Sequence, residues 1–175
     1  MQARYAIFLL TLLVMLIGNP MPMWLWPSGD RAQWWQVFTY VLCHGGWLHF
    51  AVNMVALLSF GGVMEREWGT ARFAAFYLVV SVWAGAFTAL LFLDSIPLIG
   101  ASGTVLAVMG AYVIRFPNRR IATLWPVPVK AWKAMVVFAA LSFAALVFEW
   151  MPTVGHGIHL VGLAFGVGYG LTRLR

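Results

Sequence analysis

Charged side chains are scarce in this chain, because only 9% of its 175 residues are Asp, Glu, Lys or Arg. Soluble domains usually carry about 25% charged residues. Hydrophobic residues instead make up 63% of the chain, and its mean hydropathy is +0.88. A water-soluble fold of this length could not hide so much apolar surface. The composition therefore predicts a protein whose solvent is lipid.

Cysteine is nearly absent, and acidic residues are few. The one cysteine, Cys43, excludes an intrachain disulfide and a structural metal site built on cysteine. No cofactor or metal is expected, since His156 and His159 lack the third ligand that a zinc site needs. The acidic residues all lie at helix ends or in loops, so carboxylate proton relays of the transporter kind are missing. These residues are Asp30, Glu65, Glu67, Asp94 and Glu149.

Six apolar runs indicate the fold class, which is all-α. Backbone groups in a bilayer have no partner but one another, so each run is predicted to be a helix. The whole chain, 1–175, is expected to form a single six-transmembrane-helix bundle. The N-terminal run is interpreted as a retained helix, because no small-residue cleavage site follows it. The runs are 4–18, 47–64, 70–93, 102–115, 131–149 and 158–172.

The net charge of +6 comes from basic residues at the ends of these runs. They are not gathered on one polar segment with interleaved aromatics, so no nucleic-acid partner is expected. One set of helix ends carries ten of the eleven basic residues, and the opposite set carries only Arg31. Basic residues stay cytoplasmic, which predicts an even number of spans and cytoplasmic termini. The ten are Arg4, Arg66, Arg72, Arg115, Arg119, Arg120, Lys130, Lys133, Arg173 and Arg175.

Four polar residues within the runs lie at a similar depth. A helix rises about 1.5 Å per residue. Measured from the basic ends of their helices, Ser102 and His159 lie ~20 Å along the axis, whereas Asn53 and His49 lie ~18 and ~24 Å along it. In a hydrocarbon core about 30 Å thick, this layer is roughly 10 Å below the external face. Unpaired polar groups are costly in lipid, so a shared cavity open to the outside is expected.

The residue types in this layer point to acyl transfer. Ser102 lies at a predicted helix start, where its backbone N–H is unpaired and the helix dipole favours negative charge. Histidine is the usual base that activates serine near neutral pH. His49 and Asn53 are four residues apart and share one helix face, and both can donate hydrogen bonds to an oxyanion. The set therefore predicts a nucleophile, a base and three donors.

Glycines predict how two of these helices meet. Gly162 and Gly166 follow His159 by three and seven residues, which forms a stripe of small residues. Gly103 and Gly110 form a matching stripe on the fourth predicted helix. Small residues let membrane helices approach closely, so the fourth and sixth helices are expected to be in contact. That contact would bring the serine and the histidine together.

In three segments the chain resembles the rhomboid intramembrane proteases. Their order and their placement on the second, fourth and sixth predicted helices agree with that family. The resemblance covers nearly the whole chain and is to the minimal six-helix bacterial form. The segments are His44-Gly-Gly-Trp-Leu-His49-Phe-Ala-Val-Asn53, Gly100-Ala-Ser102-Gly103 and His159-Leu-Val-Gly162-Leu-Ala-Phe-Gly166.

The resemblance implies a mechanism and a setting. Ser102 and His159 would form a catalytic dyad without a third carboxylate. His49, Asn53 and the Ser102 amide would bind the oxyanion. The substrates would be transmembrane proteins cut near the external membrane face, and the chain would lie in the bacterial inner membrane. We expect His44 to steady the loop beside the site.

Two residues depart from the family pattern. Gln36 follows Trp35 where members often have arginine, and Leu106 stands where many have a tyrosine that stacks on the histidine. The sequence leaves the substrate, the oligomeric state and the gate open. A gate formed by the fifth helix and the loop 150–157 is one hypothesis.

Other functions stay possible at this point. A rhomboid-like scaffold without catalysis would bind membrane helices through the same bundle, and His49 and Asn53 would then only join helices. A small transporter or channel would use the polar cavity, although inverted repeats are missing from the sequence. Reaction of Ser102 with a serine-directed probe distinguishes a protease from a scaffold.

Overall fold

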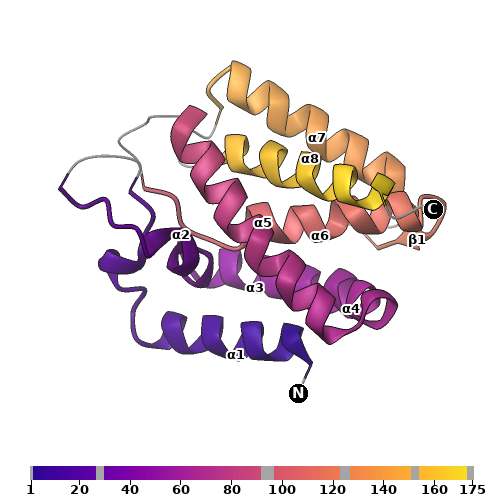
Figure 1. Cartoon of the computed structure of the whole chain (residues 1–175). Helices are drawn as coiled ribbons and strands as arrows, with labels where there is room; N and C mark the ends of the chain where they lie inside the picture. Colours follow the sequence, from indigo (N-terminus) through magenta and orange to yellow (C-terminus); the bar gives the residue numbers. More distant parts are fainter. Residues whose placement is uncertain (1, 27–29, 92–96, 123–126, 151–153, 173–175) are drawn as a thin grey trace.

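The computed structural model describes residues 2–26, 30–91, 97–122, 127–150 and 154–172, and these are mainly helical (Figure 1). The all-α fold class is thus confirmed. Asp94, Arg173, Arg175 and residues 151–153 of the predicted gate loop lie outside the described part. The longer helices are α1 (Ala3–Leu16), α3 (Trp47–Ala56), α4 (Gly62–Trp68), α5 (Thr70–Leu91), α6 (Ser102–Arg115), α7 (Ala131–Val147) and α8 (His156–Thr172).

The predicted boundaries differ from the observed ones in a few places. The second predicted helix consists of α3, a π-helical turn η3 (Leu57–Gly61) and α4, which follow one another without a break. The first loop contains three single turns, and the predicted loop 116–130 contains a two-stranded antiparallel hairpin. These short elements are η1 (Met21–Met23), α2 (Gln36–Thr39), η2 (Tyr40–Leu42), β1 (Arg120–Ile121) and β2 (Val129–Lys130).

Length and apolar composition identify two membrane-spanning candidates among the described residues. They are the continuous stretch Trp47–Trp68 and the first 19 residues of α5, Thr70–Thr88. Helices α1, α6 and α7 are apolar but contain 10–17 residues each. At about 1.5 Å per residue, the 14 residues of α6 extend ~21 Å. That length is less than a hydrocarbon core of about 30 Å.

Helix α6 lies at the centre of the bundle. Ten of its 14 residues are buried, and α3, α5, α7 and α8 surround it (Figure 1). Its polar Thr104 is paired inside the core, where its hydroxyl lies 3.1 Å from the Ser81 hydroxyl of α5. The Tyr40 hydroxyl donates to the Ser81 carbonyl at 2.8 Å. The hydroxyls of Tyr40, Ser81 and Thr104 therefore each have a partner inside the core, which offsets the cost of burying them.

Helices α6 and α8 touch through their backbones at glycines. A Cβ atom on Gly162 would overlap the Gly103 carbonyl, and one on Gly166 would overlap the Ala107 carbonyl. From the opposite side, a Cβ on Gly110 would lie 2.8 Å from the Leu163 carbonyl oxygen. Only glycine permits this approach, so the stripe predicted from the sequence lies at the helix contact.

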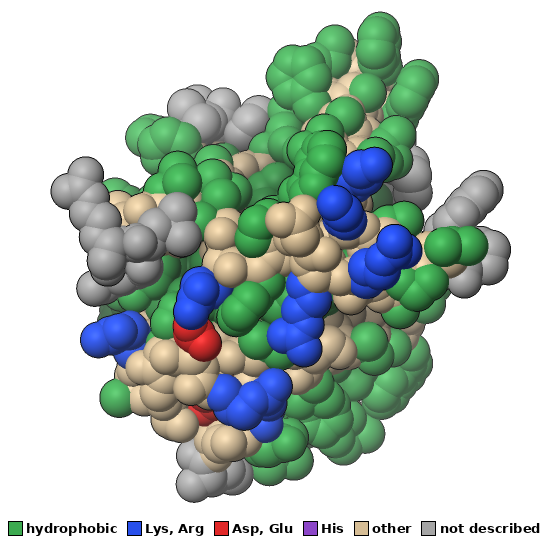
Figure 2. Space-filling model, turned by 90° about the vertical axis from the view of Figure 1, so that its right-hand side faces the viewer, with side chains coloured by type: hydrophobic (Ala, Val, Ile, Leu, Met, Phe, Trp, Pro, Cys, Tyr) green, Lys and Arg blue, Asp and Glu red, His purple; other side chains and the backbone are tan. Residues whose placement is uncertain are grey.

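The outside of the bundle is apolar along the helices and basic at one end. Figure 2 shows Lys and Arg side chains gathered on one face, with hydrophobic surface around them. We call this face the basic end. Its exposed cations are Arg66, Arg72, Arg115, Arg119, Arg120, Lys130 and Lys133. Exposed apolar side chains include Leu9, Leu10, Leu13 and Leu16 of α1, Leu78, Val79, Trp83 and Phe87 of α5, and Val136, Val137, Leu141 and Phe143 of α7.

The first loop is held together by Gln36, which stands where the family that the sequence resembles often has arginine. Its side chain is 1% exposed. The amide nitrogen donates to the carbonyls of Pro22 at 3.2 Å and Arg31 at 2.8 Å. The amide oxygen accepts from the backbone N–H of Trp26 at 3.2 Å and of Gln33 at 3.0 Å. A neutral amide that both donates and accepts thus joins two sides of the loop.

The glycine contact leads to a stability prediction with a matched control on the same helix. We expect Gly166→Ala to lower the free energy of unfolding by about 3 kcal/mol, because the new methyl would overlap backbone that cannot move aside. Gly168 has nothing within 4 Å of the position a Cβ would take. Gly168→Ala should therefore be neutral or stabilising by up to about 1 kcal/mol. Equilibrium unfolding in mixed micelles, followed by circular dichroism, measures both variants, and equal stability would contradict the close approach.

The Gln36 bonds lead to a prediction for the first loop. Gln36→Ala leaves two N–H and two carbonyl groups without their partner, and at about 1 kcal/mol for each bond we expect a loss of 2–4 kcal/mol. The loop should also become more sensitive to limited proteolysis. Gln33→Ala is the control, because only the backbone N–H of Gln33 bonds to Gln36. If both variants melt and resist protease as the unchanged protein does, Gln36 does not organise the loop.

Candidate active site

Ser102 is the first residue of α6. Gly100 precedes it with a φ of +114°, a conformation that L side chains rarely adopt, and this turns the chain into the helix. The first helical bond runs from the Val105 N–H to the Ala101 carbonyl at 2.8 Å. The N–H of Ser102 lies upstream of this bond, among the donors that a helix start leaves unpaired.

His159 lies in the first turn of α8 and contacts the serine. Its Nε2 atom is 2.9 Å from the Ser102 Oγ atom, which is hydrogen-bond distance. The residues next to Ser102 and His159 explain why these two side chains come into contact. A Cβ on Gly103, which follows the serine, would lie 3.0 Å from the carbonyl oxygen of Ile158, which precedes the histidine. The helices therefore meet one residue away from the two reactive side chains.

The predicted oxyanion donors lie on α3, on the other side of the serine. The His49 ring packs on Gly100, since a Cβ there would lie 2.7 Å from its Cε1 atom and 3.0 Å from its Nε2 atom. Its Nδ1 atom accepts a hydrogen bond from the Gly45 N–H at 3.3 Å. Neutral imidazole has one donor and one acceptor nitrogen, so the proton is assigned to Nε2, on the side of the Gly100 turn.

Asn53 follows His49 by one helical turn and is 5% exposed. Its Nδ2 atom donates to the His49 carbonyl at 2.9 Å, which leaves its second N–H available. Among the described residues, no hydrogen bond joins Asn53 to Ser102. The structure therefore places His49 against the serine turn and leaves the Asn53 amide bonded to its own helix.

His44 lies beside His49, in the loop before α3. Its side chain is 1% exposed, and its ring centroid is 4.9 Å from that of His49 and 5.7 Å from that of Phe50. Asn19 fixes its backbone, donating to the His44 carbonyl at 2.7 Å and accepting from its N–H at 3.1 Å. Burial, with the nearby His49, lowers the pKa of His44 to about 4, so its ring is neutral at physiological pH.

Phe138 is the residue near the site that the sequence did not reveal. It comes from α7, and its ring centroid lies 5.9 Å from that of His159 with the planes tilted by 46°. Leu106, at the family's tyrosine position, is a buried apolar residue of α6. The aromatic contact to the histidine thus comes from a different helix. In the sequence, only the lack of an aromatic residue at position 106 hinted that this contact would come from another helix.

His156 lies one turn before His159, with ring centroids 6.0 Å apart. Neither of its ring nitrogens has a hydrogen-bond partner among the described residues, although both are buried. Within that same part of the chain, no three His, Cys, Asp or Glu side chains come together as metal ligands. No described carboxylate bonds to His159, so the arrangement offers a serine, one base and nearby N–H donors. That set is suited to acyl transfer.

Comparison with known proteins places the chain in a family. A family model described as Rhomboid domain matches residues 31–175. "Rhomboid protein 1, mitochondrial" of Saccharomyces cerevisiae is 30% identical over 135 residues, which cover 73% of this chain and 38% of the relative. "RHOMBOID-like protein 6, mitochondrial" of Arabidopsis thaliana is 29% identical over 140 residues, which cover 80% of this chain and 44% of the relative.

A bacterial relative is closer in length. "Rhomboid protease GlpG" of Haemophilus influenzae is 28% identical over 136 residues, which cover 78% of this chain and 68% of the relative. The chain spans less than half the length of the two mitochondrial relatives. The family model, in contrast, covers most of the chain, including Ser102, His159, His49 and Asn53. The chain therefore belongs to the Rhomboid family of integral membrane proteins.

Proposed function

We propose that the chain is an intramembrane serine endopeptidase that cleaves transmembrane proteins. The observation that carries this proposal is the 2.9 Å contact between His159 Nε2 and Ser102 Oγ at the start of a helix. Two bacterial relatives are named as proteases, "Rhomboid protease GlpG" and "Rhomboid protease GluP" of Bacillus subtilis. A scaffold without catalysis would not need a base at hydrogen-bond distance from a serine.

The proposed reaction begins with proton transfer. His159 Nε2 takes the Ser102 hydroxyl proton while Oγ attacks the scissile carbonyl carbon, which forms a tetrahedral intermediate. The imidazolium then gives this proton to the amine nitrogen, and the C–N bond breaks to leave an acyl-serine. Water, deprotonated by the same imidazole, attacks the acyl carbon and releases the acid product and the serine hydroxyl. One histidine thus serves as base and acid in both halves of the reaction.

Stabilisation of the oxyanion is assigned to three donors. The Ser102 N–H lies at the start of α6, where the helix dipole favours negative charge. The Nε2–H of His49 faces the Gly100 turn, and the free N–H of Asn53 is one turn away on the same helix. Removing one such donor from a protease costs about 10²–10³ in kcat. The donors come from two helices, so their geometry depends on how α3 packs against α6.

The short α6 supports a site that is sunk into the membrane. We infer six spans, formed by α1, the α3–η3–α4 stretch, α5, α6, α7 and α8, with the basic end in the cytoplasm. Because α6 extends only ~21 Å from that end, Ser102 would lie roughly 10 Å below the external face of a ~30 Å core. Substrates would then be cut near the external end of a transmembrane segment, and a bacterial inner membrane is the proposed location.

Removal of the nucleophile tests the activity. We expect Ser102→Ala to abolish cleavage of a single-span model substrate in liposomes, and His159→Ala to do the same. Both variants should melt at temperatures close to that of the unchanged protein, since neither residue is fully buried. Cleavage by Ser102→Ala at the original rate would remove the proposal.

Chemical labelling distinguishes a protease from a scaffold without catalysis. A fluorophosphonate or isocoumarin probe should modify Ser102 covalently in the unchanged protein and not in Ser102→Ala or His159→Ala. A scaffold would bind membrane helices without reacting with the probe. Intact-mass measurement of the labelled chain shows whether one probe is attached, and an unlabelled but folded chain supports the scaffold.

Phe138 is proposed as a positioning residue for His159. Its ring contacts the imidazole from α7, and no aromatic from α6 occupies the family's usual place. A base that is misplaced by about 1 Å can cost up to 10²-fold in rate. The aromatic contact would therefore make the orientation of the base depend on the place of α7.

We expect Phe138→Ala to lower kcat and the rate of probe labelling about tenfold, with a smaller change in KM. Phe138→Tyr keeps the ring and should restore most of the rate. Phe143→Ala is the matched control on α7, because Phe143 is 60% exposed on the outer surface. Labelling of Phe138→Ala at the original rate would show that the ring does not position the base.

A further inference from the structure

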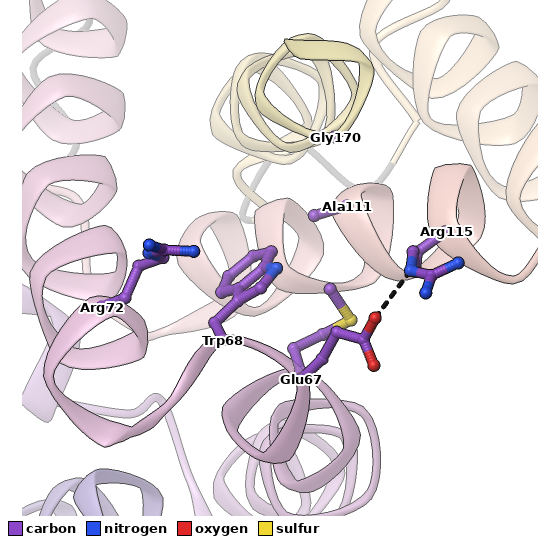
Figure 3. A pocket seen from close by; sticks show the side chains of 7 residues that line it. Glu67, Trp68, Arg72, Ala111, Arg115 and Gly170 are labelled. Atoms are coloured by element: carbon purple, nitrogen blue, oxygen red, sulfur yellow. Dashed lines mark hydrogen bonds and ion pairs between the residues drawn. The ribbon is translucent and has the colours of Figure 1, made fainter. Parts of the chain in front are cut away.

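A pocket opens at the basic end, away from Ser102. Its volume is about 250 Å³, and it lies where α4 ends, α5 begins and α6 and α8 come to their last turns (Figure 3). Arg115 lies 13 residues after Ser102 on the same helix, which is ~20 Å along the axis. The pocket is thus separate from the candidate active site. It is lined by Met64, Glu67, Trp68, Arg72, Ala111, Arg115 and Gly170.

Two arginines flank this pocket, and both have guanidinium N–H groups that no described residue accepts from. In Figure 3 Arg72 and Arg115 approach it from opposite sides, with Trp68 between them. Arg115 Nε donates to Glu67 Oε1 at 2.7 Å, which uses one of the five N–H groups of its guanidinium. Arg72 has no hydrogen bond or ion pair with any described residue. With Arg72, Arg115 and Glu67 all ionised, the lining carries a net charge of +1.

The surroundings increase the attraction for an anion. The basic end exposes seven cations but only one carboxylate, Glu67, among the described residues. Glu65 does not offset them, because it is 2% exposed and bonded to Arg4 at 3.2 Å. Clusters of Lys and Arg at the surface of a membrane attract anionic lipids. The ligand is therefore expected to be negatively charged.

The size and the lining residues of the pocket limit further which ligands could bind there. A volume of 250 Å³ equals about eight waters at ~30 Å³ each, and it is below the ~300–1,000 Å³ of pockets for drug-sized molecules. Arginine binds phosphate oxygens through two parallel N–H groups. Trp68 forms a fixed wall, since its ring packs on Phe76 at 5.0 Å and Tyr169 at 5.1 Å. Tryptophan also favours the headgroup region of a bilayer.

We propose that this pocket binds the phosphodiester headgroup of one anionic phospholipid. Arg72 and the free N–H groups of Arg115 donate to the phosphate oxygens, and Trp68 lies beside the glycerol. The bound lipid would link the α4–α5 turn to the ends of α6 and α8. The site does not depend on proteolysis, so a failure of either proposal leaves the other standing.

The test uses the full chain in a neutral detergent and native mass spectrometry to count bound lipids. The ligands are a dioleoyl phosphatidylglycerol, the phosphatidylcholine with the same acyl chains, and inorganic phosphate. We expect one phosphatidylglycerol to bind at least tenfold more tightly than phosphatidylcholine. Arg72→Gln should weaken that binding about tenfold, and Arg72→Lys should weaken it less because the charge remains. Millimolar inorganic phosphate should not displace the lipid.

Arg66→Gln is the matched control, because Arg66 is an exposed cation of α4 at the same end but does not line the pocket. It should bind phosphatidylglycerol as the unchanged protein does. An equal loss in Arg66→Gln would show that the whole basic end attracts lipid without a site. Equal binding of phosphatidylcholine would show that the pocket does not recognise negative charge, and displacement by phosphate would point to a free anion. Each of these results would overturn the proposal.

Discussion

The backbone contact between α6 and α8 is the constraint on which the rest of the structure depends. Lipid provides no hydrophobic force that would press two apolar helices together, so membrane helices associate through close packing and hydrogen bonds. Gly103, Gly162 and Gly166 remove the side chains that would keep these backbones apart. The contact begins one residue from Ser102 and His159, which fixes the distance between them without help from a third polar group. In the proposed reaction, a dyad of two side chains would then take much of its geometry from this helix contact.

Much of this arrangement could be predicted from the sequence, because lipid allows few alternatives. A chain in a bilayer must pair its backbone groups within helices, so the apolar runs gave most of the helices to within a few residues. Polar residues in such runs are costly, which singled out Ser102, His159, His49 and Asn53 without any structure. The small-residue stripe then indicated which two helices lie in contact. In each case a local pattern indicated where a residue or helix would lie, although it left the role of that residue open.

Three features were not predicted, because the sequence does not show which groups are in contact there. Gln36 lies in the first loop, and its four hydrogen bonds reach backbone groups up to 14 residues away. Phe138 reaches His159 from a neighbouring helix, and the helical pattern of α7 does not show which of its aromatics points inward. The π-helical turn at Leu57–Gly61 shifts the register between α3 and α4 within a run that reads as one helix. Packing decides all three, and the hydrophobic pattern of the sequence does not reveal them.

The two ends of α6 carry opposite ends of the helix dipole, and different groups lie at each end. At its start the unpaired N–H groups and the positive end of the dipole suit an oxyanion, and this is where Ser102 lies. At its end Arg115 complements the negative end of the dipole and keeps donors free for a phosphate. The glycines of α8 hold both turns in place along the same contact. A lipid bound at the basic end would therefore contact the same helix that carries the serine.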